Sequence, residues 1–175
     1  MRRTVIAAVA SVLLAATAQA EMAAPPQPGA TPAPAAPAAP PPQYGAPGVN
    51  LEQAQAAVAA AVAEAKKNGW LMAVAVTTVG GYLVSFSKMD QTQFASVQIA
   101  MDKAKAAATF RRPTKVFEDR ANGGGPSVLS LHGVVASEGG IPLMRDGKVI
   151  GAIGCSGGTG QQDGVACKAG ADTIK

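Results

Sequence analysis

The segment best suited to binding chemistry places three cations, Arg111, Arg112 and Lys115, beside the aromatic ring of Phe110. Guanidinium groups bind carboxylates through paired hydrogen bonds, and an aromatic ring offers an apolar surface to a flat molecule. The segment therefore indicates a site for a planar acidic ligand. A solvated helix end, whose cations complement the helix dipole, explains the same residues equally well.

His132 is the single histidine of the chain, and it is the only strong nitrogen ligand for an iron porphyrin or a cobalt corrinoid. A lone histidine is more often structural, and Met89, Met101 or a hydroxyl are alternative ligands. No second histidine or cysteine stands at ligand spacing from His132. The sequence therefore argues against a zinc site or a non-haem iron triad.

A glycine-rich loop, Ser156-Gly157-Gly158-Thr159, comes directly before the last predicted helix. Backbone N–H groups at the start of a helix can receive an anion, so this loop is a candidate ligand-lining segment. It lacks the Lys-Ser/Thr ending of a nucleotide-phosphate loop, and Ser156 has only one histidine available as a catalytic partner. We expect a structural or ligand-lining loop and no catalytic residues.

Two cysteines, Cys155 and Cys167, stand close together near the end of the chain. Strand periodicity places Cys155 with Ile153, and helical periodicity places Cys167 with Gly170 and Ile174. Both side chains can then point into the layer between strand and helix. We expect a disulfide, with two buried thiols as the alternative.

The first twenty residues resemble a secretory signal, with Arg2 and Arg3, then an apolar stretch, then a small-residue ending at Ala20. The apolar stretch is shorter than the ~20 residues that span a bilayer. We expect cleavage after Ala20, no stable membrane insertion and a periplasmic or secreted protein. Residues 21–48 are nearly all Ala, Pro, Gln and Gly, a composition typical of a disordered linker.

Cleavage of the signal leaves 13 basic and 11 acidic residues, so the formal net charge falls from +4 to +2. This excess is too small to indicate nucleic-acid binding. The remaining residues 49–175 are enough for one domain with a single hydrophobic core.

Hydrophobic periodicity and turn residues predict alternating helices and hairpins in this domain. The predicted helices are 51–65, 93–110, 114–120 and a last one after Thr159, with a helical turn at 127–130; the predicted strands are 71–79, 82–88, 134–136, 141–145 and 148–156. Hairpins with few crossovers indicate an α+β fold with a mainly antiparallel five-stranded sheet flanked by helices.

Local signals support several of these elements. Gly80-Gly81 and Asp146-Gly147 predict tight hairpin turns, and Asn50 and Thr159 predict capping boxes. In the alanine-rich helix 93–110, apolar spacing places Lys103 away from the buried face.

Two segments together resemble the GlcG/HbpS-like haem-binding family: residues 139–160, GGIPLMRDGKVIGAIGCSGGTG, and residues 103–115, KAKAAATFRRPTK. The resemblance extends over residues 49–175. It implies a profilin-like layout, homo-oligomers and a haem site whose threonine and aromatic-basic stretch match Thr109-Phe110-Arg111. It supplies no catalytic triad.

Three hypotheses fit these residues. The first is an exported haem-binding protein, a scavenger or a sensor accessory, with His132 or Thr109 on the metal. Its expected cofactor-binding residues are Thr109, Phe110, Arg111, Arg112, Lys115 and His132. The second is a binding protein or enzyme of glycolate or diol metabolism that holds an organic acid or a corrinoid, although no general base or nucleophile stands out. The third is an oligomeric module without a ligand.

Overall fold

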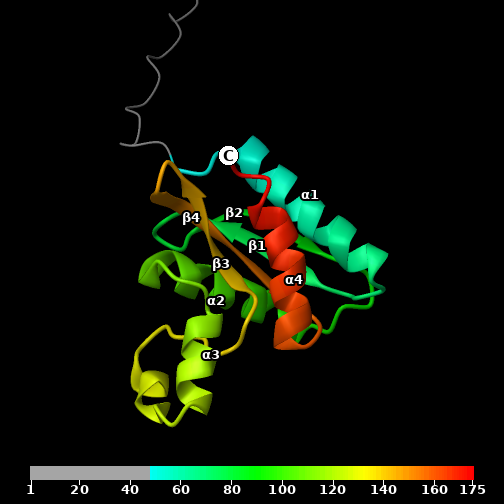
Figure 1. Ribbon diagram of the computed structural model, residues 1–175. Helices are drawn as coiled ribbons and strands as arrows, with labels where there is room; N and C mark the ends of the chain where they lie inside the picture. Colours follow the sequence, from blue (N-terminus) through cyan, green and yellow to red (C-terminus); the bar gives the residue numbers. More distant parts are fainter. Residues whose placement is uncertain (1–47) are drawn as a thin grey trace, which may run out of the picture. The chain divides into compact units, whose positions relative to one another are not determined.

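A computed structural model describes residues 48–175 of the chain. This part is a four-stranded antiparallel sheet in the order β2-β1-β4-β3, with helices on both faces (Figure 1). The strands are β1 (Ala73–Thr77), β2 (Leu83–Lys88), β3 (Gly140–Arg145) and β4 (Lys148–Ser156). The helices are α1 (Leu51–Lys67), α2 (Ala95–Phe110), α3 (Lys115–Asn122) and α4 (Gly160–Ala171), with a 3₁₀ turn η1 (Pro126–Ser130) after α3.

The two faces of the sheet bury side chains of different size. On the face covered by α1 and α4, the buried residues are large, with Met72, Val74 and Ile153 among them. On the α2 face they are small, with Ala73 and Ala75 packed against alanines of the helix. The small side chains let α2 lie close to the sheet, which positions the end of that helix against β4.

One glycine shows how close this approach is. A Cβ atom added at Gly154 of β4 would overlap the backbone oxygen of Ala100 and lie 2.5 Å from the backbone nitrogen of Ala104, both in α2. Side chains bulkier than hydrogen at this point would push the helix away from the sheet.

The predicted caps and turns are present. Asn50 with Gln53, and Thr159 with Gln162, form the two capping boxes at the starts of α1 and α4. The β3–β4 hairpin turns at Asp146 and Gly147, both with positive φ, and Gly81 also has positive φ between β1 and β2. The chemistry of these short segments therefore fixes where the elements begin and end.

The prediction of a five-stranded sheet was wrong, because residues 134–136 form no strand. Gly140 pairs with Gly154, so continuing the same register would set Ala136 opposite Gly158. By that point β4 has ended at Ser156 and the chain has entered the glycine-rich loop. The segment has no strand left to pair with, and it lies instead beside α2.

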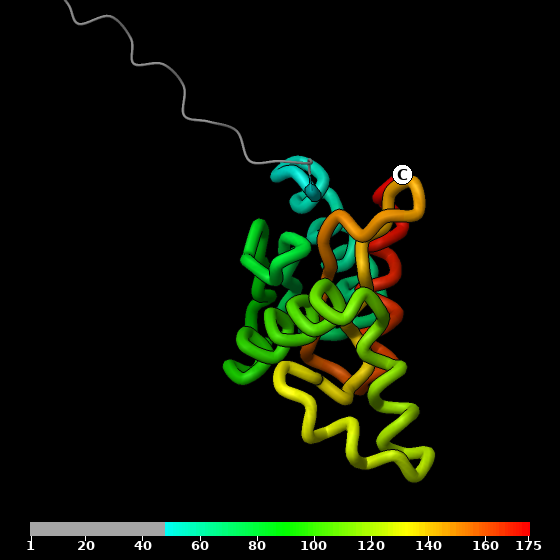
Figure 2. The backbone as a smooth tube through the Cα atoms, turned by 90° about the vertical axis from the view of Figure 1, so that its left-hand side faces the viewer, coloured from blue at the N-terminus to red at the C-terminus, as the bar shows by residue number. Residues whose placement is uncertain are grey.

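The α3 helix and η1 project beyond one end of the sheet, as Figure 2 shows from the side. No helix in residues 48–175 is both long enough and apolar enough to cross a membrane. The expected signal and most of the linker lie outside the described residues, so the periplasmic or secreted location stays a prediction. The profilin-like layout and the homo-oligomer also stay predictions.

Candidate functional site

The candidate site is centred on the end of α2, where Phe110 is the last helical residue. Its half-buried ring meets that of Phe117 edge to face, with centroids 5.2 Å apart. Arg111 follows in the left-handed conformation, with φ of 56° and ψ of 38°, and its N–H caps the helix. Left-handed backbone is strained for a residue with a side chain, by roughly 1–3 kcal/mol, and such strain is common at functional sites.

A hollow of about 560 Å³ is lined in part by Phe110. It brings together Thr109, Phe110 and His132, three of the residues that the sequence singled out. Its other lining residues are Asp102, Lys105, Gly133, Val134 and Val135. The segment expected as a fifth strand therefore forms a wall of this hollow.

The two candidate metal ligands differ in their existing contacts. Thr109 is exposed, and its hydroxyl donates a hydrogen bond to the Lys105 carbonyl oxygen at 2.8 Å. His132 is also exposed, and within residues 48–175 its imidazole has no hydrogen-bonding partner. Either imidazole nitrogen, whichever is unprotonated, is thus free to bind a metal, whereas the Thr109 hydroxyl proton is already engaged.

A second hollow, of about 600 Å³, shares the Phe110 ring and holds Arg111 and Arg112. Lys148, at the start of β4, adds a third cation that sequence reasoning missed. The Arg112 Nε atom donates to the Phe110 carbonyl oxygen at 3.1 Å. Neither arginine forms an ion pair with an acid of the described residues, so their charge is available to an anionic ligand. We name these two adjoining hollows the cationic site.

Lys115 does not join the cationic site. It lines a third hollow, between β3 and α4, together with Glu138 and Lys168. Its ammonium group lies 2.7 Å from the Asp119 carboxylate, and the hydrogen bond to Asp119 raises its pKa. The sequence could not separate Lys115 from the arginines, because the chain turns at Pro113 between them.

The glycine-rich loop has partners of its own. The hydroxyls of Ser156 and Ser96 are hydrogen bonded at 3.1 Å in the interior, and Thr159 caps α4. The Gly158 N–H donates to the Asp163 carboxylate at 3.0 Å. None of the residues 156–159 lines the hollows described above, so a ligand role for this loop stays a prediction.

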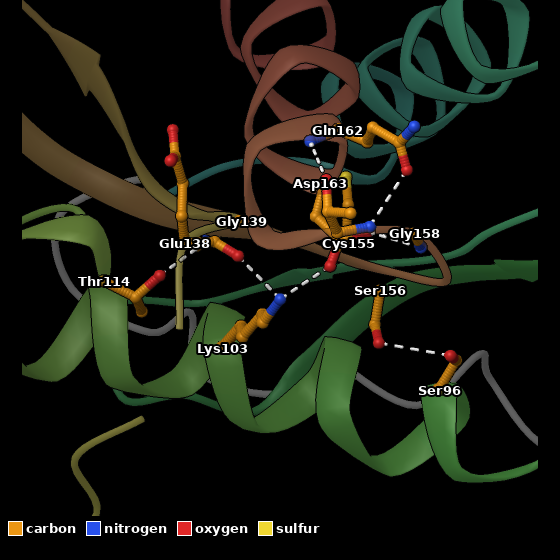
Figure 3. A network of polar contacts seen from close by, with 12 residues as sticks. Ser96, Lys103, Thr114, Glu138, Gly139, Cys155, Ser156, Gly158, Gln162 and Asp163 are labelled. Atoms are coloured by element: carbon orange, nitrogen blue, oxygen red, sulfur yellow. Dashed lines mark hydrogen bonds and ion pairs between the residues drawn. The ribbon is translucent and has the colours of Figure 1, made fainter. Parts of the chain in front are cut away.

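A buried ion pair that the sequence analysis missed joins the two helical layers (Figure 3). Lys103 reaches from α2 to Asp163 of α4, with its Nζ 2.8 Å from the carboxylate, and both side chains are about 97% buried or more. The same Nζ donates to the Glu138 carbonyl oxygen at 2.6 Å. Burial raises the pKa of Asp163, against the lowering effect of Lys103 and the backbone N–H of Gly158.

The expectation that Lys103 faces away from the core was therefore wrong. The buried face of α2 contains Ser96, Ala100, Lys103 and Ala107, a helical spacing that could have revealed it. Through Glu138, Lys103 fixes the end of the segment that begins with His132. The pair thus supports one wall of the cationic site.

Cys155 of β4 and Cys167 of α4 form a disulfide, as predicted. Both cysteines are fully buried in the core between the sheet and α4. The bond ties α4 to the central strand next to the Lys103–Asp163 pair.

The α+β fold thus places an aromatic ring between a hollow that holds a histidine and a hollow that holds two arginines without acid partners in the described residues. Residues 49–172 match the family described as haem degrading protein HbpS-like, and the chain belongs to that family.

Its relatives include the protein GlcG of Escherichia coli strain K12, 40% identical over 108 residues, which cover 62% of this chain and 81% of GlcG. HbpS of Streptomyces reticuli, solved as a double mutant, is 28% identical with a TM-score of 0.70, covering 81% of this chain and 98% of the HbpS chain. A PduOC:heme complex is 25% identical with a TM-score of 0.66, covering 73% of this chain and 96% of the other.

Proposed function

We propose that this protein binds haem at the cationic site. The observation that carries the proposal is that Phe110 lines both hollows, one with His132 and Thr109 and the other with Arg111, Arg112 and Lys148. Haem has a flat apolar ring system, a central iron and two carboxylates at one edge. The site offers a surface or partner for each of these three parts.

The residues divide the binding between them. Phe110 supplies an apolar face for the ring, and its edge-to-face contact with Phe117 holds it in place. Arg111 and Arg112 bind the carboxylates through charge-assisted hydrogen bonds. His132 supplies the iron ligand, because its nitrogens have no other partner among the described residues. When bound, haem supplies redox and oxygen chemistry at its iron.

The relatives support this reading. The family description names haem degradation, and one solved relative is a complex with haem. The basic and apolar start of the chain supports export, so we propose a periplasmic or secreted haem-binding protein, with scavenging or service to a sensor as its role.

A haemin titration of the purified protein, followed by its Soret band, tests the proposal. We expect a saturable spectral change with one haem bound per chain. Titration without saturation, at the level seen with an unrelated protein, would contradict haem binding.

Two variants test the metal ligand. His132→Ala should shift the Soret and visible bands of bound haem, whereas Thr109→Val should leave them in place. If the spectrum changed in Thr109→Val and stayed the same in His132→Ala, the assignment of His132 would be wrong.

A further inference from the structure

The hollow between β3 and α4 takes no part in the proposed haem site. It has a volume of about 580 Å³, within the range of small-molecule sites. Its walls are mainly apolar, with Ile141, Pro142 and Met144 of β3 on one side, and Ala171, the last residue of α4, and Ile174 after it on the other. An apolar wall of this kind can hold a hydrocarbon body out of water.

The free edge of β3 is poorly suited to pair with another strand. The Thr114 N–H and hydroxyl exchange hydrogen bonds with the Gly140 carbonyl and N–H, at 3.0 and 2.9 Å. Pro142 has no N–H to donate. The first two outward N–H groups of this edge, at positions 140 and 142, are thus taken or missing, which disfavours addition of a β-strand.

Charge decides which small molecule fits. The hollow is lined by two cations, Lys115 and Lys168, but each lies 2.7 Å from its own acid one helical turn away, Asp119 and Asp172. Glu138 also lines the hollow. Within residues 48–175 its carboxylate has no ion pair and no hydrogen-bond donor.

Both backbone polar groups of Glu138 are hydrogen bonded, whereas its carboxylate points away from these contacts (Figure 3). Its N–H donates to the Glu118 carboxylate and its carbonyl accepts from Lys103. Figure 3 shows the carboxylate directed away from the Lys103–Asp163 pair. A Cβ atom added at Gly164 would lie 2.5 Å from the Glu138 Oε1 atom, so the glycine leaves room for the carboxylate beside α4.

We propose that this hollow binds a small organic amine, with its ammonium group on Glu138 and its apolar body along the β3 and α4 walls. Among the described residues, the half-buried Glu138 carboxylate is the one charged group of the lining without an ion-pair partner. A cation placed there forms a charge-assisted hydrogen bond and loses little hydration compared with a fully buried ion.

Three probes with the same six-carbon body and different charge test this site: hexylammonium, hexanol and hexanoate, each titrated into the full-length protein and followed by calorimetry. We expect hexylammonium to bind most tightly and hexanoate least. Glu138→Gln should weaken hexylammonium about tenfold, to the level of hexanol, which corresponds to one charge-assisted hydrogen bond. Glu52→Gln, an exposed acid at the start of α1, is the matched control.

A second variant locates the binding. Ile174→Asn makes the apolar wall polar without adding charge, and it should weaken hexylammonium and hexanol together. Binding is assigned to this hollow only if Ile174→Asn weakens it. Hexanoate that binds at the arginines of the cationic site should be unaffected by this variant and is thereby distinguished. Equal or tighter binding of hexanoate in the hollow, or unchanged hexylammonium affinity in Glu138→Gln, would overturn the proposal. So would the absence of saturable hexylammonium binding.

Discussion

The cationic site and the hollow between β3 and α4 differ in the charge that each leaves without a partner. The cationic site exposes Arg111 and Arg112, which have no acid partner in the described part of the chain. The other hollow pairs its lysines internally and leaves the carboxylate of Glu138. The charge that is left without a partner, and not the number of cations nearby, therefore indicates which ligand charge each hollow favours.

Both regions depend on the same support. The Lys103 ammonium holds the Glu138 carbonyl. Glu138 follows the wall His132–Val135 by three residues, and it lines the other hollow. Damage to this support should affect both hollows, whereas changes at their own charges should separate them.

The largest effect is expected for Lys103→Met, which removes one partner of the buried pair and leaves the Asp163 carboxylate without it. Breaking a buried ion pair costs about 3–5 kcal/mol. The free energy of unfolding, measured by chemical denaturation, should fall by that amount, and both ligands should bind more weakly. Conversely, a loss below about 1 kcal/mol, the scale of an exposed pair, would contradict the structural role given to Lys103.

Removing the disulfide should have a slightly smaller effect on stability and little on ligand choice. For a closed loop as short as that between Cys155 and Cys167, chain entropy gives about 3 kcal/mol. Denaturation with and without reductant measures it, with a Cys155→Ala/Cys167→Ala variant as the comparison. If reductant lowered the stability of the double variant as well, the loss could not be assigned to the disulfide.

Replacing both arginines by glutamine should weaken haem binding at least tenfold, because a hydrogen bond to a charged group contributes about 1.5–3 kcal/mol. Lys115→Gln removes a cation from the neighbouring hollow and should leave haem affinity unchanged. Haemin titrations of the wild type, the double arginine variant and Lys115→Gln measure these affinities. An equal loss in Lys115→Gln would mean that the two regions form one site.

The smallest expected effect is a pH dependence of the stability that Lys103→Met loses relative to the wild type. Burial already raises the pKa of Asp163 above 3.8, and loss of Lys103 removes a charge that lowers it. In the variant the folded state therefore takes up a proton at higher pH than the wild type. As pH falls from neutral toward 3.8, the variant should recover stability relative to the wild type, by about 1.4 kcal/mol for each unit of additional pKa rise. Denaturation at a series of pH values checks this; a deficit that grows in acid would contradict it.

Much of the fold could be predicted from local signals. Capping residues at Asn50 and Thr159, and turn residues at Gly81 and Gly147, act within a few positions of themselves, so they can be recognised in the sequence. The number of strands could not be found in this way. Residues 134–136 have strand composition, but β4 ends before it reaches them, and that length is a property of the whole sheet.

Only the part of the candidate site that depends on local sequence could be predicted. Thr109, Phe110 and the two arginines are neighbours in the chain, and His132 was chosen by its type. Lys148 and the Asp163 partner of Lys103 come from distant elements, so only tertiary structure reveals them. Lys115 is near the arginines in sequence but turns into another hollow after Pro113.

In the proposed function, the arginines of the cationic site hold the carboxylate edge of haem. A direct test compares the affinity of the full-length protein for haemin with its affinity for the dimethyl ester of haemin, which has the same ring and iron but no carboxylate charge. We predict that the ester binds at least tenfold more weakly, and that the Arg111→Gln/Arg112→Gln/Lys148→Gln variant, which lacks all three cations of that hollow, no longer distinguishes the two. Equal affinities of the wild-type protein for haemin and its ester would contradict the account.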